Sequence, residues 1–296
     1  MFENDLKIGR EWNIVHDKEF QASNAKLKYA VIGKGEPVLC VHGTTLADSL
    51  ITPLQLYRPL FENYQFISYY RAGYNGSTLE KETLTIGEGA DHIKELIEHL
   101  NLKKVHLLAF SFGGVIGFEF ILKYREMLKS AILLEPYLPR ESKEGIEANT
   151  KAFMDAFALY LSGDKEGAAM SYMKAVCGED FFSCVDMTGP LDVWERMKGG
   201  VTTTFEVDFP AISNWDFSMT SALKTMDKPD LDLLAVMGFH SEAVMPGFRE
   251  TQNFLMQFFP KAQRCGIIGA THGMQSMNPI AVGKAIHQFL DSLKST

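Results

Sequence analysis

The chain has 296 residues, a length that allows two domains or one large α/β core carrying an insertion. Its 46% hydrophobic and 22% charged residues are typical of a globular protein and exclude a disordered or collagen-like chain. The 37 acidic and 29 basic residues give a formal charge of -8 and leave no dense Lys/Arg stripe, which argues against nucleic acid as a partner.

The cellular setting is predicted from the N-terminus and the cysteines. Residues 1–13 carry acidic side chains where a secretory signal would be basic, and no apolar segment follows them. No apolar run reaches the roughly 18 residues that span a bilayer, so we expect a cytoplasmic protein that does not enter a membrane. Cys40, Cys177, Cys184 and Cys265 lack the spacing of a zinc site or a disulfide framework, and we expect no metal and no cofactor.

Strands and helices are predicted to alternate in the first part of the chain. Strands are expected over residues 25–33, 37–41, 65–70, 104–110 and 131–135, and helices over 85–100 and 115–128. The run Pro37–Val41 is continuously apolar, as in strands buried on both faces of a parallel sheet. The alternation indicates an α/β architecture.

A helical insertion interrupts this alternation. Between about residues 139 and 228 the pattern favours helices, with clear segments at 150–161 and 167–176 and no convincing strand. Strands are predicted again at 231–237 and 264–268, and helices at 249–258 and 279–293. We therefore expect an α/β core formed by residues 1–138 and 229–296, with residues 139–228 as a helical cap.

The most informative motif is Ala109-Phe110-Ser111-Phe112-Gly113-Gly114, between a predicted strand and a predicted helix. Small residues stand two positions before and two positions after Ser111. A sharp strand-to-helix turn with this spacing forces the serine into a strained backbone conformation and exposes its hydroxyl at the top of the sheet. Ser111 is therefore the candidate nucleophile.

A serine nucleophile needs a base, and the base needs a carboxylate partner. His272 lies in the glycine-flanked loop Gly269–Met274 after the last predicted strand and is the preferred base. His92, His99 and His287 fall on predicted helices and His106 on a strand. Two carboxylates follow predicted strands, and we prefer Glu135 as the acid, with Glu242 as the alternative.

Acyl transfer also needs donors for a developing oxyanion. The backbone N–H of Phe112, at the start of the predicted helix, is one candidate. The N–H of Thr44, in the loop after His42-Gly43, is the other, and His42 is expected to brace that loop. Arg71 could contact a carboxylate, but its position in a turn favours a structural role.

Four motifs together resemble the α/β-hydrolase fold superfamily, in that family's order and over nearly the whole chain. They are His42-Gly43-Thr44, Arg71-Ala72-Gly73-Tyr74-Asn75-Gly76-Ser77, Ala109 to Gly114, and Gly269-Ala270-Thr271-His272. The resemblance implies an eight-stranded, mostly parallel sheet, a helical cap after the sixth strand and a Ser-acid-His triad at the carboxyl edge.

Three positions depart from the family pattern: Ala109 and Asn75 stand where glycine is frequent, and Ser241 stands where many members carry an acid. Ser241 stands after the seventh strand, where many members carry the acid, which favours Glu135 because some branches place the acid after the sixth strand. Haloalkane dehalogenases and epoxide hydrolases use an aspartate nucleophile, and Ser111 excludes both activities.

We expect a serine hydrolase that cleaves a small, largely apolar carboxylic ester or lactone through an acyl-enzyme at Ser111. The predicted substrate pocket is lined by Phe110, Phe153, Phe157, Tyr160, Trp194 and Trp215. The alternatives are hydrolysis of diketone C–C bonds, thioesters or amides, peracid formation, or a non-catalytic ligand-binding receptor of the same fold. The expected partner is a small-molecule substrate, and a homodimer is left open.

Overall fold

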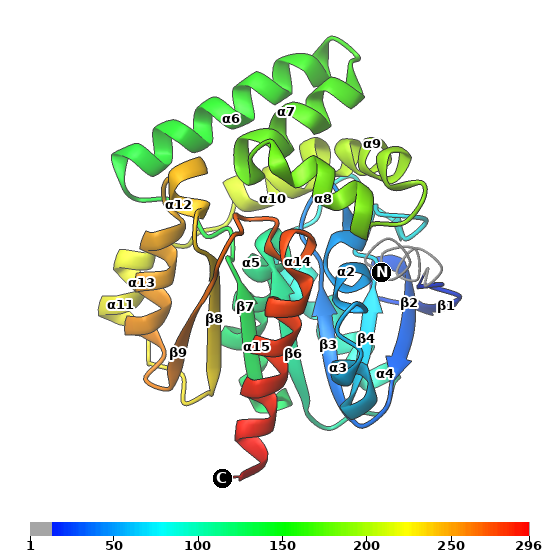
Figure 1. Ribbon diagram of the computed structural model, residues 1–296, viewed down its shortest axis with the longest axis vertical. Coiled ribbons are helices and arrows are strands. Elements are labelled where there is room, and N and C mark those ends of the chain that lie inside the picture. The colour runs from blue at the N-terminus through cyan, green and yellow to red at the C-terminus, as the bar shows by residue number, and fades with distance from the viewer. Residues whose placement is uncertain (1–13, 296) are drawn as a thin grey trace.

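A computed structural model describes residues 14–295, and residues 1–13, on which the signal-sequence argument rests, lie outside them. One sheet runs through the centre of the molecule (Figure 1). Its strands are β1 (Lys18–Gln21), β2 (Ala25–Gly33), β3 (Glu36–Val41), β4 (Tyr64–Tyr69), β5 (Thr78–Leu79), β6 (Val105–Phe110), β7 (Leu128–Leu134), β8 (Leu233–Gly238) and β9 (Ala262–Ile267). The spatial order is β1-β2-β4-β3-β6-β7-β8-β9, with β5 paired to β2.

The sheet is parallel from β4 to β9 and antiparallel at its β1–β2 end. Every residue of the central strand β6 is buried, as expected for a mostly apolar strand inside a parallel sheet, and its one polar residue, His106, has polar partners on both ring nitrogens. Because parallel strands end at the same edge, the loops after β3, β6, β7 and β8 meet there. Ligands of open α/β sheets bind at this edge.

Helices cover both faces of the sheet. On one face lie α4 (Ile86–His99), α5 (Ser111–Tyr124) and α13 (Phe248–Phe258), and on the other α3 (Pro59–Asn63) and α15 (Pro279–Ser292). Short helices and turns complete the core: η1 (Ala47–Ser49), α2 (Ile51–Leu54), η2 (Arg125–Met127), α12 (Ser241–Val244), α14 (Met274–Met277) and η4 (Leu293–Ser295). Two hydrophobic clusters, one on each face, hold these layers together.

The chain between β7 and β8 is helical throughout its regular structure. It forms α6 (Lys143–Leu161), α7 (Lys165–Cys177), α8 (Asp180–Thr188), α9 (Val193–Thr203), the π-helical segment η3 (Thr204–Asp208), α10 (Phe209–Ser213) and α11 (Met219–Thr225). In Figure 1, α6 to α10 stand over the carboxyl edge of the sheet, whereas α11 lies beside α13. The expected insertion, residues 139–228, thus includes one helix that packs on the core.

Several predicted boundaries differ from the structure, and the helix predicted over 150–161 begins earlier, at Lys143. The helix predicted over 115–128 begins at Ser111 and ends at Tyr124, and β7 starts three residues earlier than the predicted strand, at Leu128. A tertiary contact holds the first part of β7 in the sheet: the Oγ atom of buried Ser130 lies 2.8 Å from Nδ1 of His106 on β6. Strands β1 and β5 escape prediction because they are short and mostly exposed.

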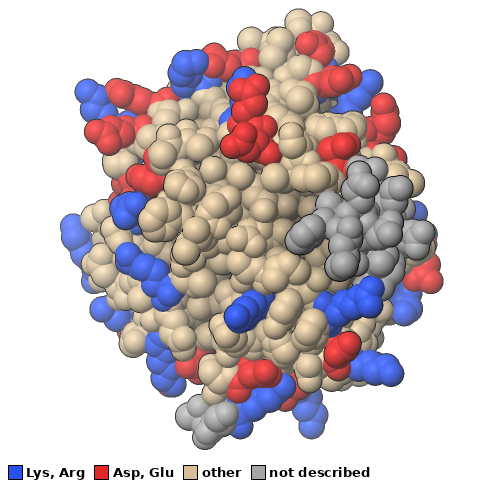
Figure 2. Space-filling view, viewed as in Figure 1, with Lys and Arg blue, Asp and Glu red and all other residues tan. Residues whose placement is uncertain are grey.

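The surface in Figure 2 carries lysine, arginine, aspartate and glutamate mainly around its margin, with few charged side chains in the centre. On the described part of this face the basic side chains do not form a continuous band. Within residues 14–295, no helix combines the length and the apolar character needed to cross a membrane.

Candidate active site

Ser111 lies at the turn between β6 and α5, with a backbone φ of 53°. This left-handed conformation is uncommon and strained for a residue other than glycine. The turn also brings α5 against the chain that follows β3, so that a Cβ on Gly113 would collide with the carbonyl oxygens of Val41 and His42. The small residue two positions after the serine is therefore a steric requirement.

The structure brings Ser111, His272 and Glu135 together from three separate loops. His272 Nε2 lies 2.8 Å from Ser111 Oγ, and His272 Nδ1 lies 2.7 Å from Glu135 Oε2. All three residues are buried. The second carboxylate oxygen of Glu135 accepts a hydrogen bond of 2.8 Å from the backbone N–H of Gly238, at the end of β8.

Two aromatic rings fix the orientation of the His272 imidazole. Phe248 stacks on it, with ring centroids 4.5 Å apart and planes inclined by 18°. Phe110 packs against it at 4.8 Å with an inclination of 32°. Because Nδ1–H can donate to the carboxylate of Glu135, Nε2 is left as an acceptor facing the Ser111 hydroxyl. This arrangement is the one that a general base requires.

The alternative acid, Glu242, does not reach His272. Its carboxylate accepts hydrogen bonds from the backbone N–H groups of Gly247, at 3.3 Å, and Arg249, at 2.8 Å, and so caps the start of α13. Glu135 itself has a φ of 40°, so this candidate acid, like Ser111, has a left-handed backbone.

The other histidines named above have structural partners far from Ser111. His106 contacts Ser130 and Glu36, His92 contacts Asn24, His99 contacts Tyr29, and His287 contacts Asp291.

The two predicted oxyanion donors flank the serine. Phe112 is the second residue of α5, where backbone N–H groups have no partner within the helix. Thr44 lines the cavity that contains Ser111, and the preceding residue, Gly43, packs against the Ser111 side chain. Both residues are therefore next to Ser111, Thr44 in the loop after β3 and Phe112 in the turn between β6 and α5.

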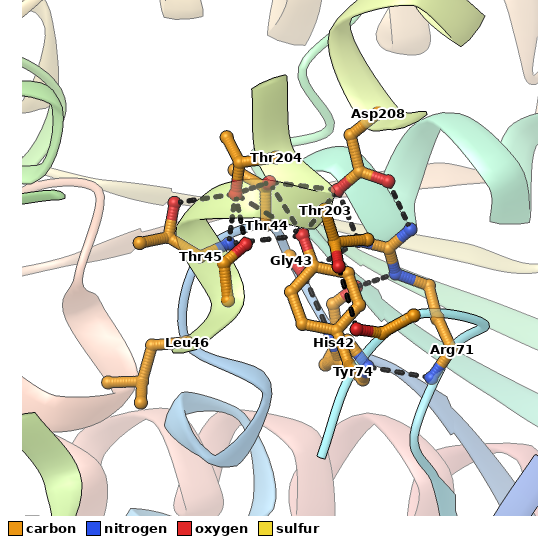
Figure 3. Close-up of polar contacts among 12 residues, drawn as sticks. His42, Gly43, Thr44, Thr45, Leu46, Arg71, Tyr74, Thr203, Thr204 and Asp208 are labelled. Atoms are coloured by element: carbon orange, nitrogen blue, oxygen red, sulfur yellow. Dashed lines mark hydrogen bonds and ion pairs between the residues drawn. The ribbon is translucent and has the colours of Figure 1, made fainter. Parts of the chain in front are cut away.

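The loop containing Thr44 is held by a buried polar network, which Figure 3 shows. His42 Nε2 accepts a hydrogen bond of 2.9 Å from the backbone N–H of Arg71, and His42 Nδ1 lies 2.7 Å from the carbonyl oxygen of Gly43. Burial, with the nearby Arg71 charge, holds the pKa of His42 well below its usual range. His42 is therefore a neutral brace of the loop.

Arg71 does contact a carboxylate, and the carboxylate belongs to the protein. It pairs with Asp208 of η3, its Nη2 lying 2.7 Å from Asp208 Oδ2, and both side chains are almost fully buried. Burial opposes the charge of Arg71, but Asp208 outweighs that effect and raises its pKa. The Asp208 partner is 137 residues away in sequence, which is why the sequence pattern gave no sign of it.

The cavity at Ser111 is small, at about 10 Å³, which is close to the space that one water molecule needs. Helices α7 and α8 of the cap close it from above. Its lining consists of Thr44, Ser49, Phe110, Ser111, Tyr172, Met173, Val176, Cys177, Phe181, His272, Gly273 and Gln275. Burial raises the pKa of the Cys177 thiol well above its usual value, so this cysteine is not a thiolate.

Phe110 lines this cavity as predicted, but the five predicted cap aromatics do not. Phe153 lines a second cavity of about 310 Å³ between α6 and α10. Phe157 and Tyr160 pack on Phe205 within the cap, Trp194 packs on Phe182 near the surface, and Trp215 stacks on Phe217. Composition indicated an aromatic-rich cap but not which face of each helix points at the serine.

Tyr172, Met173, Val176 and Cys177 line the cavity instead, from the C-terminal half of α7. Their spacing of three and four residues indicates one helix face, but the sequence does not say that this face meets the catalytic edge. Gln275 lines the cavity as well. It is fully buried, and its side-chain amide has no hydrogen-bond partner among the residues that the structure describes.

Comparisons with known proteins agree with this architecture. A family model described as the alpha/beta hydrolase fold matches residues 36–177. A curated relative, the uncharacterized hydrolase YcgS of Bacillus subtilis, is 32% identical over 123 residues, a match that covers 40% of this chain and 42% of the relative.

Solved structures match over most of the chain. A thermophilic esterase from Thermogutta terrifontis has a TM-score of 0.72 and 21% identity, and the match covers 93% of this chain and 99% of that one. Naproxen esterase from Bacillus subtilis has a TM-score of 0.73 and 17% identity, with 98% and 95% covered. Est816, an N-acyl homoserine lactone degrading enzyme, has a TM-score of 0.67 and 16% identity, with 92% and 100% covered.

The sheet order, the strand-turn-helix at Ser111 and the helices inserted after β7 define an α/β-hydrolase architecture. The chain therefore has the α/β-hydrolase fold, which the family model matches over residues 36–177 and the solved structures match over most of its length.

Proposed function

We propose that the protein is a serine hydrolase that cleaves a small, largely apolar carboxylic ester or lactone through an acyl-enzyme at Ser111. The observation that carries this proposal is the buried hydrogen-bonded chain from Ser111 Oγ through His272 to Glu135. A buried, fully partnered chain of this kind lowers the cost of removing the serine proton as its oxygen attacks.

The proposed reaction uses each group in turn. Ser111 Oγ attacks the carbonyl carbon, its proton moves to His272 Nε2, and the carbonyl oxygen becomes an oxyanion next to the N–H groups of Thr44 and Phe112. Collapse of this intermediate breaks the C–O bond, and His272 returns the proton to the leaving alkoxide. Water then attacks the acyl-enzyme by the same route, while Glu135 stabilises the imidazolium.

The cavity supports a small and mostly apolar acyl group, because Phe110, Met173, Val176 and Phe181 form much of its wall. Its volume of about 10 Å³ implies that the cap must move for a substrate to enter. The side-chain amide of Gln275 has no partner among the described residues. It can therefore hydrogen-bond a polar group of the bound substrate, as a donor through Nε2 or as an acceptor through Oε1.

The solved relatives make esters and lactones the first substrates to try. Two of those described above are named as esterases, and one is named as a degrader of N-acyl homoserine lactones. Both reactions break an acyl C–O bond, and the same triad chemistry serves both.

The proposal is tested with a fluorophosphonate, which phosphonylates an activated serine. Intact-mass measurement is expected to find one adduct per chain, and peptide mapping is expected to assign it to Ser111. Ser111→Ala is the matched control and should remain unlabelled. A folded wild-type protein that gains no adduct and hydrolyses neither short acyl esters nor lactones would overturn the proposal in favour of a ligand-binding receptor.

A further inference from the structure

A buried ion pair joins the cap to Arg71, in the turn after β4, and Arg71 in turn holds the loop of the proposed oxyanion donor Thr44 (Figure 3). Asp208 lies in the cap segment η3, and Arg71 follows β4 in the core. Arg71 Nη1 donates to Asp208 Oδ1 at 2.8 Å, and Arg71 Nη2 donates to Asp208 Oδ2 at 2.7 Å. The Tyr74 hydroxyl donates to the same Oδ2 at 2.6 Å. A buried, bidentate and fully partnered pair defines its geometry closely.

The same guanidinium also fixes the loop backbone. Arg71 Nε donates to the carbonyl oxygen of His42 at 3.1 Å, and Nη2 donates to that of Gly43 at 3.0 Å. In a planar trans peptide the C=O and the following N–H point in opposite directions. Holding the Gly43 carbonyl toward Arg71 therefore turns the Thr44 N–H away from Arg71, to the side of the peptide where the Ser111 cavity can lie.

Arg71 also touches the second proposed donor residue. Its guanidinium carbon lies 4.8 Å from the ring centroid of Phe112 and 4.8 Å from that of Tyr74, on which it makes cation–π contacts. One side chain therefore contacts both the loop of Thr44 and the residue after Ser111. Its charge is balanced by a residue of the cap.

The cap holds the loop directly as well. Thr44 Oγ1 lies 2.8 Å from Asp208 Oδ2 and 2.9 Å from Thr204 Oγ1, and the backbone N–H of Thr45 donates to Thr204 Oγ1 at 3.1 Å. Thr45 has a φ of 65°, a left-handed conformation that needs such support. Gly200 of α9 allows the close approach, because a Cβ there would collide with the carbonyl oxygen of Thr45.

We infer that Asp208 is a positioning residue, which sets the direction of the Thr44 N–H through Arg71 and thereby couples the seating of the cap to assembly of the oxyanion site. This inference rests on the proposed function. It implies that η3 stays docked during turnover, and that the part of the cap over the serine, α7 and α8, moves to admit substrate.

The test is Asp208→Asn, which keeps the side-chain shape but removes the charge that holds Arg71. Loss of one oxyanion donor costs about 10²–10³ in kcat, so a displaced donor is expected to cost about 10- to 100-fold. KM should change little, because ground-state binding does not depend on the oxyanion. The affinity for a trifluoromethyl ketone, which forms a tetrahedral oxyanion on the serine, should fall by the same factor as kcat.

Two variants keep the test decisive. Arg196→Gln is the matched control. Arg196 forms another ion pair between cap and core, with Asp48 of η1 at 3.2 Å, and its hydrogen bonds go to Asp48, Tyr70 and Asp192 rather than to Arg71, Asp208 or Thr44. The substitution should lower Tm and leave kcat and inhibitor affinity unchanged. Thr44→Val removes the hydroxyl that contacts Asp208 while the charge pair stays intact. It should lower kcat about tenfold at constant KM, even where Asp208→Asn fails to fold.

All rates are expressed per active site, counted by exhaustive fluorophosphonate labelling. A fall in kcat and in ketone affinity for Asp208→Asn or Thr44→Val, with Arg196→Gln unaffected, supports the inference. Variants within about threefold of wild type in both quantities, or a rise in KM alone, overturn it while the proposed function stands. A wild-type protein that neither labels nor turns over any ester or lactone overturns the proposed function, and this inference with it.

Discussion

Glu135 Oε2 lies 2.7 Å from Nδ1 of His272, although 137 residues separate the two in sequence. Both side chains are buried, and the other oxygen of Glu135 accepts the N–H of Gly238. The carboxylate therefore has a partner on each oxygen and can hold one tautomer of the imidazole.

The identity of the acid can be tested with two conservative substitutions. Glu135→Gln should reduce kcat by about 10⁴, because the amide favours the wrong tautomer of His272. Glu242→Gln is the matched control and should stay close to wild-type activity, since Glu242 only caps α13. Initial rates on one ester measure both. A crippled Glu242→Gln beside a normal Glu135→Gln would reverse the assignment.

The sharp turn at Ser111 between β6 and α5 predicts that a larger side chain at Gly113 destabilises the fold. Gly113→Ala should destabilise the protein by about 1–3 kcal/mol or more, because its Cβ would collide with backbone of the loop after β3. Gly87→Ala, in the first turn of α4, meets no heavy atom closer than 3.7 Å and should stabilise by about 0.5–1 kcal/mol. Urea unfolding measures both, and equal effects would contradict the steric argument.

The cavity lining predicts which residues select acyl length. Met173→Ala removes volume from the wall beside Ser111 and should raise kcat/KM for an octanoate ester relative to an acetate ester by about tenfold or more. Trp194→Ala, at 37% exposure and outside this lining, should leave the ratio unchanged. A shift produced by Trp194→Ala alone would mean that the cap presents a different face to the substrate.

His16 predicts an acid-sensitive contribution to stability. Burial, opposed in part by Asp48, lowers the pKa of His16 from 6.5 to about 4. The unfolded chain therefore binds a proton near pH 6.5 that the folded chain refuses until about pH 4, so stability that is present above pH 6.5 is lost as the pH falls through this range. The loss should be about 3 kcal/mol, because each pKa unit corresponds to about 1.4 kcal/mol.

His16→Gln cannot titrate and isolates this effect. On going from neutral pH to about pH 4.5, the free energy of unfolding of the wild type should fall by more than that of the variant. The reason is that only the unfolded wild-type chain gains a proton at position 16. Urea titrations at both pH values measure the difference. A constant difference would show that His16 does not resist protonation in the folded protein.

The sequence by itself determined the main strands of the core sheet and the position of the strand-to-helix turn at Ser111. Apolar runs such as Pro37–Val41 and the small residues around Ser111 are local signals, and each constrains the backbone within a few residues. The order of serine, acid and histidine along the chain followed from the same signals together with the family resemblance.

The tertiary structure alone decided which distant side chains meet. Glu135 and Glu242 both follow strands, and the choice between them depends on where each backbone turns after the strand ends. The cap aromatics fit any apolar surface by composition, and packing directed most of them into the cap and α7 toward the serine. The pair Arg71–Asp208 has no local signature, because the free energy of a buried ion pair depends on burial and on partners that only the folded chain supplies.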